Sequence, residues 1–541
     1  MNKNKNSATT LILILVGLLL FVYIGIFAYL NMFKFTQHVD SDIAVDALLV
    51  REIWTEKDLT PNNWIASTER LVIGVPALAS IFYGASGSMV FSMGISCVII
   101  GILFLAAIAF TLKRCRISNL GIATALLALC ALPINGIRND GQMVPFVTLL
   151  WFLFADYYAL HSICLFLCIT FYLYLRENVI NNTQAAKKST TIIGWLVLTG
   201  LCGGLALGGM RCLQVVILPL VLWEILLLFF ESKHMGEKLS SKRFQATGFI
   251  FTLLLVGVLA KLYPTNVDYP MFFQTSEGMV SRLTQEVPAA VLSCLGIAGN
   301  CLLTSFSAVM QMGIVAVVIL TVYGLVFLLR HKTKDGNSVP MTQKMMLQAL
   351  CTSFLFTVFV EVVTTAETAH NYFFMVWFVV IAVFAMLITY FEKAAPCFAR
   401  LIALCVCCFA VCNIFYTYKD CITTEDNLAE YEEVISFMES ENISHGYAEF
   451  WDASRISIMT DGAITMGHCY HMEDLCMYWW TTSTKWYVPN LPEQMPTAYV
   501  IRTEDKEAFT AQFEDPSIVS LGFENERFAV YTSEWNLVPM T

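Results

Sequence analysis

Long apolar segments dominate the first 418 residues of this 541-residue chain. Each is close to the length that an α-helix needs to cross a hydrocarbon layer of about 30 Å. Lipid offers the backbone no hydrogen-bond partner, so segments that cross it must be helical. Charged residues make up only 14% of the chain, too few to cover a soluble protein of this size. The sequence predicts a polytopic α-helical membrane protein with about eleven transmembrane helices, at residues 9–31, 86–111, 118–136, 155–175, 190–207, 212–230, 245–263, 307–329, 346–364, 371–391 and 398–418.

The distribution of charge predicts which side of the membrane each loop faces. Residues 419–541 carry 22 acidic and 6 basic side chains, whereas residues 1–418 carry 20 acidic and 26 basic ones. With the N-terminus inside the cell, the inner segments hold 18 Lys and Arg and the outer segments before the tail hold 8, as the positive-inside rule requires. An odd number of spans then places the acidic tail outside. We therefore expect a multi-pass cell-membrane protein with a cytoplasmic N-terminus and an extracytoplasmic C-terminal domain.

Two domains are expected, a transmembrane domain at residues 1–418 and an extracytoplasmic domain at residues 419–541. The transmembrane domain has long outer loops at residues 32–70 and 264–300. In the first loop, residues 43–54 have apolar side chains at helical spacing and predict an amphipathic helix on the membrane surface. The tail predicts a small α+β fold, with helices near 426–441 and 504–513 and strands near 447–451, 498–502 and 528–532. Two further apolar stretches, 70–84 and 141–154, are expected to lie on the membrane or to be half inserted.

The composition of the chain limits the partners and ligands that can be expected. No basic stripe with interleaved aromatic residues occurs, so nucleic acid is not an expected partner. Most of the 18 Cys lie in apolar segments, where Cys packs as a small hydrophobic side chain. The stretch HCYHMEDLC, residues 468–476, matches no standard zinc spacing, and no metal ligands are assigned. Cys469 and Cys476 could pair as a disulfide in an oxidising compartment.

Two carboxylates precede the predicted surface helix. Asp40 and Asp42 are two positions apart and could supply a general base or bind a divalent cation. A carboxylate at a helix N-terminus is also a common cap. From the residues alone, a catalytic role and a role as a helix cap are therefore equally well supported for each Asp.

Further ionisable side chains gather at the outer ends of the predicted helices. A charge at membrane depth costs at least about 2.5 kcal/mol, so it usually faces a cavity or a partner. For any single residue, snorkelling at a helix end is the commoner reason. The set comprises Arg138, Asp140, Asp156, His161, Arg211, Lys261, Glu361, Glu367 and His370, whereas Glu224 is the only ionisable residue well inside a predicted span. This distribution favours a site at the outer face over a transport path through the middle.

Cations and acids in this set suggest a specific chemistry. Arg211 and Lys261 could hold a lipid phosphate, because Arg can bind phosphate through two parallel hydrogen bonds. Asp42 could then deprotonate an acceptor hydroxyl that attacks C1 of a sugar, with the phosphate as the leaving group.

The first-loop pattern DSDIAVDALLVREIWTEKDLTPNNWIASTE resembles that of bacterial C-type (GT-C) glycosyltransferases, the group that includes family 39 mannosyltransferase-like and aminoarabinose transferase-like enzymes. The resemblance implies that Asp42 is the catalytic base, with Asp40 second, and that Asp140 is the acid of the next outer loop. The segments ADYYALHS and GGMRCLQVVILPL are similar to those of uncharacterised Gram-positive members. The sequence departs from the pattern in AHNYFF, where His370 and Asn371 stand in place of an expected Arg beside Tyr372. The resemblance implies that Tyr157, His161 and Arg211 line the same cavity. Together with the charges at the outer face, it gives a predicted donor-phosphate site or cavity of Arg138, Tyr157, His161, Arg211, Lys261, His370 and Tyr372.

The resemblance implies a membrane glycosyltransferase that moves a sugar from a polyprenyl-phosphate donor to a glycan, lipid or protein acceptor outside the membrane. No cofactor is assigned, and a divalent cation stays open. The five Trp of the tail could stack on sugar rings or pack in its core. Two alternatives remain: a transporter or flippase of a lipid-linked or anionic substrate, for which Glu224 and Pro219 are the only indication, and a non-enzymatic envelope protein anchored by its helices.

Overall fold

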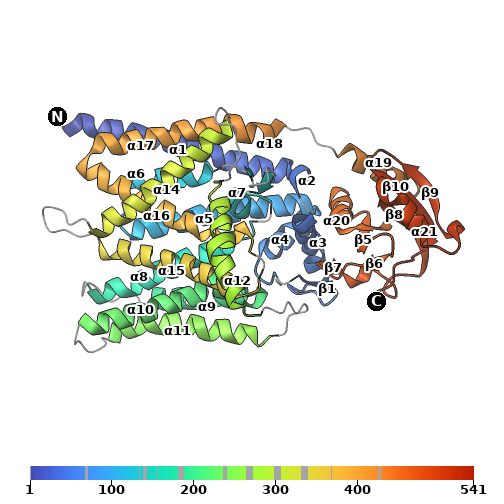
Figure 1. Ribbon diagram of the computed structural model, residues 1–541, viewed down its shortest axis with the longest axis horizontal. Helices are drawn as coiled ribbons and strands as arrows, with labels where there is room; N and C mark the ends of the chain where they lie inside the picture. Colours follow the sequence, from blue (N-terminus) through green and yellow to red (C-terminus); the bar gives the residue numbers. More distant parts are fainter. Residues whose placement is uncertain are drawn as a thin grey trace. The chain divides into compact units, whose positions relative to one another are not determined.

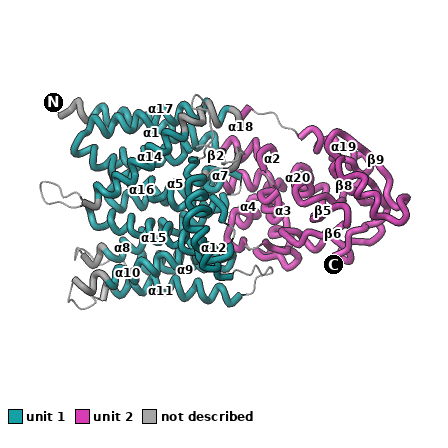
Figure 2. The backbone as a smooth tube through the Cα atoms, viewed as in Figure 1, with its two compact units in different colours: residues 1–27, 99–263, 270–421 teal, residues 28–98, 264–269, 422–541 magenta. Residues whose placement is uncertain are grey.

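The protein folds into two compact units, which are described separately (Figures 1 and 2). The first, here called the helical unit, comprises Met1–Phe27, Ile99–Tyr263 and Pro270–Cys421, and the second, the tail unit, includes Ala28–Val98 and Ile422–Thr541. The computed structural model describes residues 2–39, 41–67, 71–132, 135–137, 143–145, 147–154, 156–180, 188–234, 241–263, 272–297, 306–330, 339–366, 368–423 and 428–540.

The apolar segments form helices, as their hydropathy predicts. In the described residues nine helices are long and apolar enough to cross a membrane. The nine spans are Ser7–Phe33 in α1, Met89–Arg114 (α5), Ala159–Arg176 in α8, Ser189–Gly208 in α9, Phe244–Lys261 in α11, Gln311–Leu328 in α14, Met341–Val363 (α15), His370–Ala394 (η3 and α16) and Pro396–Asn413 (α17). The fold class predicted from the sequence, a multi-pass α-helical membrane protein with a small strand-containing C-terminal domain, is confirmed.

Two predicted spans fold as shorter helices. The segment 118–136 is helical only over α6 (Asn119–Cys130), because the chain then turns into a β-hairpin of β2 (Asn135–Ile137) and β3 (Met143–Pro145). Twelve residues of helix extend about 18 Å, which is less than the hydrocarbon thickness. The segment 212–230 folds as the π-helix η1 (Leu213–Ile217) followed by α10 (Leu218–His234).

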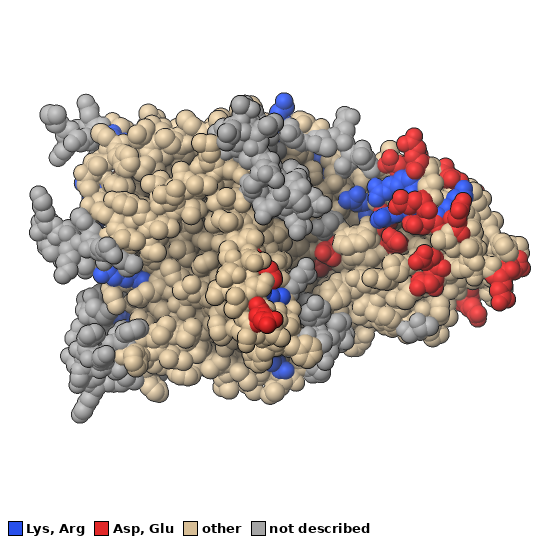
Figure 3. Space-filling model, viewed as in Figure 1, with Lys and Arg blue, Asp and Glu red and all other residues tan. Residues whose placement is uncertain are grey.

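Helix α16 (Met375–Ala394) is the centre of the helical unit. It packs against α6, α14 (Phe306–Arg330), α15 and α17, and most of its side chains are buried. A helix that is apolar on every side belongs inside a bundle. Its Phe378 lies against the rings of Trp151, Phe104 and Phe166, with centroids 4.9–5.9 Å apart. Much of the visible face of the helical unit carries no charged side chain (Figure 3).

The buried Glu224 has partners inside the helical unit. Its carboxylate accepts hydrogen bonds from the hydroxyls of Tyr172, on α8 (Ala159–Ile180), and Thr247, on α11 (Ser241–Lys261). Because this buried carboxylate accepts hydrogen bonds from two hydroxyl groups, it links α8, α11 and its own helix α10. This contact network gives Glu224 a structural role, which weakens the one sequence indication of a transport path.

The tail unit contains a six-stranded sheet, in the order β6-β5-β4-β8-β10-β9. Strand β4 pairs in parallel with β5 and β8, and the other pairs are antiparallel. The strands are β4 (His445–Glu449), β5 (Thr465–His471), β6 (Cys476–Met477), β8 (Gln494–Arg502), β9 (Ser520–Glu524) and β10 (Phe528–Trp535), with helices α19 (Ala429–Ser440), α20 (Phe450–Met459) and α21 (Lys506–Ala511). The predicted helices and strands of the tail are therefore present, and β5 and α20 are additional. Acidic side chains gather on its visible face (Figure 3).

Helix α3 (Ser41–Glu56) of the first outer loop packs within the tail unit. It contacts α20 and α4 (Val75–Ser86), and nearly every residue from Ser41 to Ile53 is buried. Arg51 Nη1 donates to the carbonyl of Gly462 at 2.8 Å, and β1 (Trp64–Ile65) pairs with β7 (Thr482–Ser483). The sequence predicts an amphipathic helix on the membrane surface. The structure instead buries it in protein, because α4, nearby in the sequence, and α20, about 400 residues away, both pack against it.

Replacing Arg51 with Ala should loosen the attachment of α3 to the tail. The variant loses a charged hydrogen bond of about 1.5–3 kcal/mol and leaves the Gly462 carbonyl without this donor. Hydrogen exchange should therefore become faster at residues 460–466 while α21 is unaffected. The control is Lys57→Ala, which removes a cation from the end of the same helix, where it lies over the Trp54 ring. Equal protection in both variants would show that the Arg51 contact is not needed for the attachment.

Candidate functional site

A cation held between two aromatic rings is the central feature of the helical unit. The guanidinium of Arg211 lies with its Cζ 4.4 Å from the ring centroid of Tyr158 and 4.7 Å from that of Tyr372. Arg211 lies between α9 (Lys188–Gly208) and η1, Tyr158 precedes α8, and Tyr372 belongs to η3 (His370–Phe373). Cation–π contacts hold the faces of a guanidinium, and its N–H edge is the part that binds phosphate. Three segments far apart in the sequence therefore position this Arg.

A second Arg and a buried carboxylate lie in the same region of the helical unit. Arg282 Nη1 donates to the carbonyl oxygens of Glu361 and Thr364, at 2.9 and 2.7 Å. The Glu361 carboxylate is 2% exposed and accepts a hydrogen bond from Gln214 at 3.2 Å. The charges of Arg282 and Arg211 both act on it. Arg282 Nε also forms an ion pair with Glu286 at 3.5 Å, so two guanidinium groups and two carboxylates lie in this region.

Asp156, which comes two residues before Tyr158, is a buried acid. It is 1% exposed, and neither carboxylate oxygen has a hydrogen-bond partner in the part of the chain that the structure describes. Its backbone has a φ of 49°, in the left-handed region that Asp and Asn tolerate better than most residues. Burial raises the pKa of the Asp156 carboxyl well above its usual range. The group is therefore protonated over a wider pH range than an exposed Asp.

Replacing Asp156 with Asn should stabilise the protein, and more so at higher pH. Because the pKa is raised in the folded state, stability is lost as pH rises above the unfolded-state pKa of about 4. Each unit of the raised pKa corresponds to about 1.4 kcal/mol. Thermal unfolding in detergent between pH 4 and 8 should show a gain in Tm for Asp156→Asn that grows with pH. The control is Glu507→Gln, which replaces an exposed acid and should show no gain in Tm that grows with pH. A gain independent of pH would contradict the account.

Asp42 lies in the first turn of α3 and is exposed. Its neighbour Ser41 donates to the carbonyl of Trp451 at 2.8 Å, and the Trp451 side chain is 57% exposed. Burial, and then the negative charge of Asp42, raises the pKa of Tyr478. Tyr478 stacks on the exposed ring of Tyr470 at 5.5 Å. In the tail unit, the carboxylate of Asp42 is thus accompanied by a set of aromatic rings.

The other predicted site residues are distributed as follows. Asp40, Arg138 and Asp140 lie outside the described residues, as does Glu367. His370 and Tyr372 share η3, His161 is on α8 with 8% exposure, and Lys261 ends α11. The structure thus joins Arg211 with Tyr372 and adds Tyr158, Glu361 and Arg282. Sequence reasoning named Tyr157, which is 36% exposed, but not Tyr158, which is 7% exposed and contacts Arg211.

The HCYHMEDLC stretch lies on the β5–β6 hairpin. Strand β5 is buried on both faces from Met466 to Cys469, which places His468 and Cys469 in the interior on opposite faces, and His471 is exposed. His468 hydrogen-bonds with Ser454 at 3.1 Å, and burial lowers its pKa to about 3, so the ring is neutral. The spacing along a strand therefore separates these side chains rather than gathering them.

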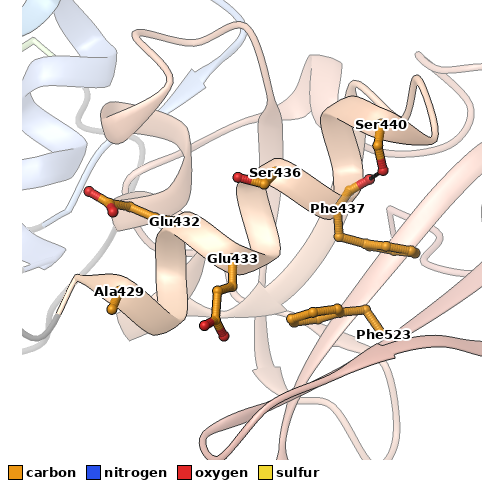
Figure 4. A pocket seen from close by; sticks show the side chains of 7 residues that line it. All are labelled: Ala429, Glu432, Glu433, Ser436, Phe437, Ser440 and Phe523. Atoms are coloured by element: carbon orange, nitrogen blue, oxygen red, sulfur yellow. Dashed lines mark hydrogen bonds between the residues drawn. The ribbon is translucent and has the colours of Figure 1, made fainter.

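The tail unit also has an open hollow between α19 and β9 (Figure 4). Glu433 and Phe437 project from α19 toward Phe523, and the two Phe rings stack with centroids 5.6 Å apart. The hollow is lined by Ala429, Glu432, Glu433, Ser436, Phe437, Ser440 and Phe523. Both rings are partly buried against the core of the tail unit, and no cation lines this hollow.

The fold and the nine candidate spans define a multi-pass membrane protein with a GT-C fold, as comparison with solved structures shows. The chain is similar to ArnT from Cupriavidus metallidurans bound to undecaprenyl phosphate, over 97% of this chain and 99% of that one, with a TM-score of 0.52 and 10% identity. The chain is also similar to an oligosaccharyltransferase from Archaeoglobus fulgidus in complex with Zn and sulfate. This similarity covers 92% of this chain and 70% of that one, with a TM-score of 0.43 and 11% identity. No family model and no curated protein sequence matches the chain.

Proposed function

We propose that this protein is a membrane glycosyltransferase that moves a sugar from a polyprenyl-phosphate donor to an acceptor hydroxyl outside the membrane. The observation that supports it most is the Arg211 clamp, because an Arg held by two Tyr rings is ordered before the ligand arrives. Preordering reduces the entropy lost on binding. The structural neighbour ArnT was solved with undecaprenyl phosphate, a lipid of the proposed donor class.

In this proposal Arg211 binds the donor phosphate with the support of Arg282, while Lys261 adds positive charge and His161 lines the cavity. A phosphate is a good leaving group, and the two guanidinium groups stabilise the negative charge that develops on it as the C1–O bond breaks. Glu361 and Glu286 hold the guanidinium groups in place before the donor binds, and Glu361 also accepts a hydrogen bond from Gln214.

Asp42 is proposed as the general base. It accepts the proton of the acceptor hydroxyl as that oxygen attacks C1, and the lipid phosphate leaves with the electron pair of the broken bond. The exposed rings of Trp451 and Tyr470 would hold the sugar or the acceptor glycan, because aromatic faces pack on the apolar faces of sugars. The N-terminus is proposed to be cytoplasmic and the tail extracytoplasmic, as the loop charges indicate.

Reconstitution into liposomes with a radiolabelled polyprenyl-phosphate sugar tests the proposal. The label should move from the lipid to an acceptor in an envelope extract, and polyprenyl phosphate should accumulate. Movement of the intact lipid across the bilayer without its cleavage would instead favour a flippase. If neither cleavage nor movement occurs, the chain acts as an envelope anchor and the proposal fails.

A further inference from the structure

Three buried cysteines converge in the helical unit, and a fourth lies beside them. Cys164 and Cys168 are one turn apart on α8, Cys202 is on α9, and Cys212 follows Arg211 in the chain. All four are 0% exposed. The Sγ of Cys202 lies 3.2 Å from that of Cys164 and 3.8 Å from that of Cys168. The Cys212 thiol donates to the backbone carbonyl of Cys202 at 3.6 Å.

The spacing of the sulfurs suits a metal ion. The Sγ atoms of Cys164, Cys168 and Cys202 lie within 4.8 Å of one another, and within the described part of the chain no other group of His, Cys, Asp and Glu is so arranged. Tetrahedral zinc with Zn–S bonds of about 2.3 Å places its sulfurs roughly 3.8 Å apart. The Cys164-x₃-Cys168 spacing also falls within the range that structural zinc sites use.

Neither hydrophobic packing nor a disulfide bond accounts for all of this geometry. Cysteines that merely fill space as small hydrophobic residues need not converge on one point. A disulfide bond between Cys164 and Cys202 would use two sulfurs and would not explain why the Cys168 sulfur lies beside them. Cys408 and Cys412 on α17 have the same spacing as Cys164 and Cys168 but are exposed, and they belong to no such group in the described structure.

The surroundings can balance the charge of such a site. Three thiols bind Zn²⁺ by releasing three protons, which leaves one negative charge on the complex. Two cations of the same unit can balance it, since Lys261 ends α11 and Arg211 is next to Cys212 in the chain.

We propose that Cys164, Cys168 and Cys202 supply three ligands to one thiophilic metal ion, Zn²⁺, as a structural site. The ion links α8 and α9, and the hydrogen bond from Cys212 to the Cys202 carbonyl ties the segment that carries Arg211 to the same place. This proposal concerns a metal site and does not depend on sugar transfer.

Metal content measured directly on the full-length protein tests the site. We expect about one zinc per chain, by elemental mass spectrometry, in protein purified in detergent through a peptide affinity tag without His. The double variant Cys164→Ser/Cys168→Ser should lose nearly all of it. The matched control, Cys408→Ser/Cys412→Ser, removes a pair with the same spacing and should retain the full content.

A second measurement on the wild-type protein needs no variant to fold. After chelation, added Co²⁺ should produce the strong absorption of thiolate-to-cobalt charge transfer, and excess Zn²⁺ should abolish it. Wild-type protein that carries no zinc and gives no cobalt spectrum would overturn the proposal, whether or not the variants fold. A Cys164–Cys202 disulfide found by peptide mapping of the native protein would overturn it as well.

Discussion

Sugar transfer by the Asp42→Asn variant should be about 10²- to 10⁴-fold slower than by the wild-type protein, the usual contribution of a general base. Asn keeps the size and hydrogen-bonding capacity of the side chain but cannot accept the proton of the acceptor hydroxyl. Asp42 is exposed in the first turn of α3, so its replacement leaves the packing of Ile43 and Ala44 unchanged. The loss should therefore fall on kcat, with the KM for the donor nearly unchanged.

The control for Asp42 must separate catalysis from helix capping. Glu432 is also an exposed acid in the first turn of a helix of the tail unit, α19. Glu432→Gln removes the same kind of interaction with a helix N-terminus and should retain full turnover. Equal losses in the two variants, or a loss in Asp42→Asn that follows a lower Tm, would mean that Asp42 is a structural cap.

The second large effect is expected for Arg211. Arg211→Ala removes two charged hydrogen bonds to the donor phosphate, each about 1.5–3 kcal/mol, so kcat/KM for the donor should fall by at least about 100-fold. Arg211→Lys keeps the charge but loses the planar group that stacks between Tyr158 and Tyr372, so it should recover only part of the activity.

Two comparisons make the Arg211 prediction specific. Tyr372→Phe retains the ring and should remain close to wild type, whereas Tyr372→Ala should weaken donor binding by several-fold, because one cation–π contact contributes about 0.5–2 kcal/mol. Arg400→Ala removes an Arg that bonds within its own helix, α17, and should have no effect on the donor. Full donor affinity in Arg211→Ala, measured by binding of polyprenyl phosphate, would exclude Arg211 from the phosphate site.

The hydropathy of the sequence and the periodicity of its apolar residues predict much of the fold by themselves. A membrane span is a local property, because twenty apolar residues satisfy the bilayer whatever their neighbours are. The helices and strands of the tail follow local periodicity in the same way. The packing of α3 on α20 could not be predicted, since an apolar helix surface does not reveal whether protein or lipid covers it.

The site was predictable only in part. Arg211 can be named because a charge near a helix end is visible in the sequence, whereas Tyr372 follows from the resemblance in AHNYFF. The sequence points to Tyr157 and not to Tyr158, because the left-handed turn at Asp156 sets which ring faces the Arg, and no periodicity predicts that turn. The sequence assigns the cysteines to hydrophobic packing, since the convergence of Cys164 and Cys168 on α8 with Cys202 on α9 is a tertiary contact.

The measurement that tests sugar transfer most directly is its stoichiometry in proteoliposomes. Mass spectrometry would count the moles of polyprenyl phosphate formed against the moles of sugar found on acceptor. With wild-type protein, one mole of polyprenyl phosphate and one mole of transferred sugar are expected per turnover, and almost none of either with Asp42→Asn. If the donor stays intact in the presence of acceptor, whether or not the protein binds it, sugar transfer is contradicted.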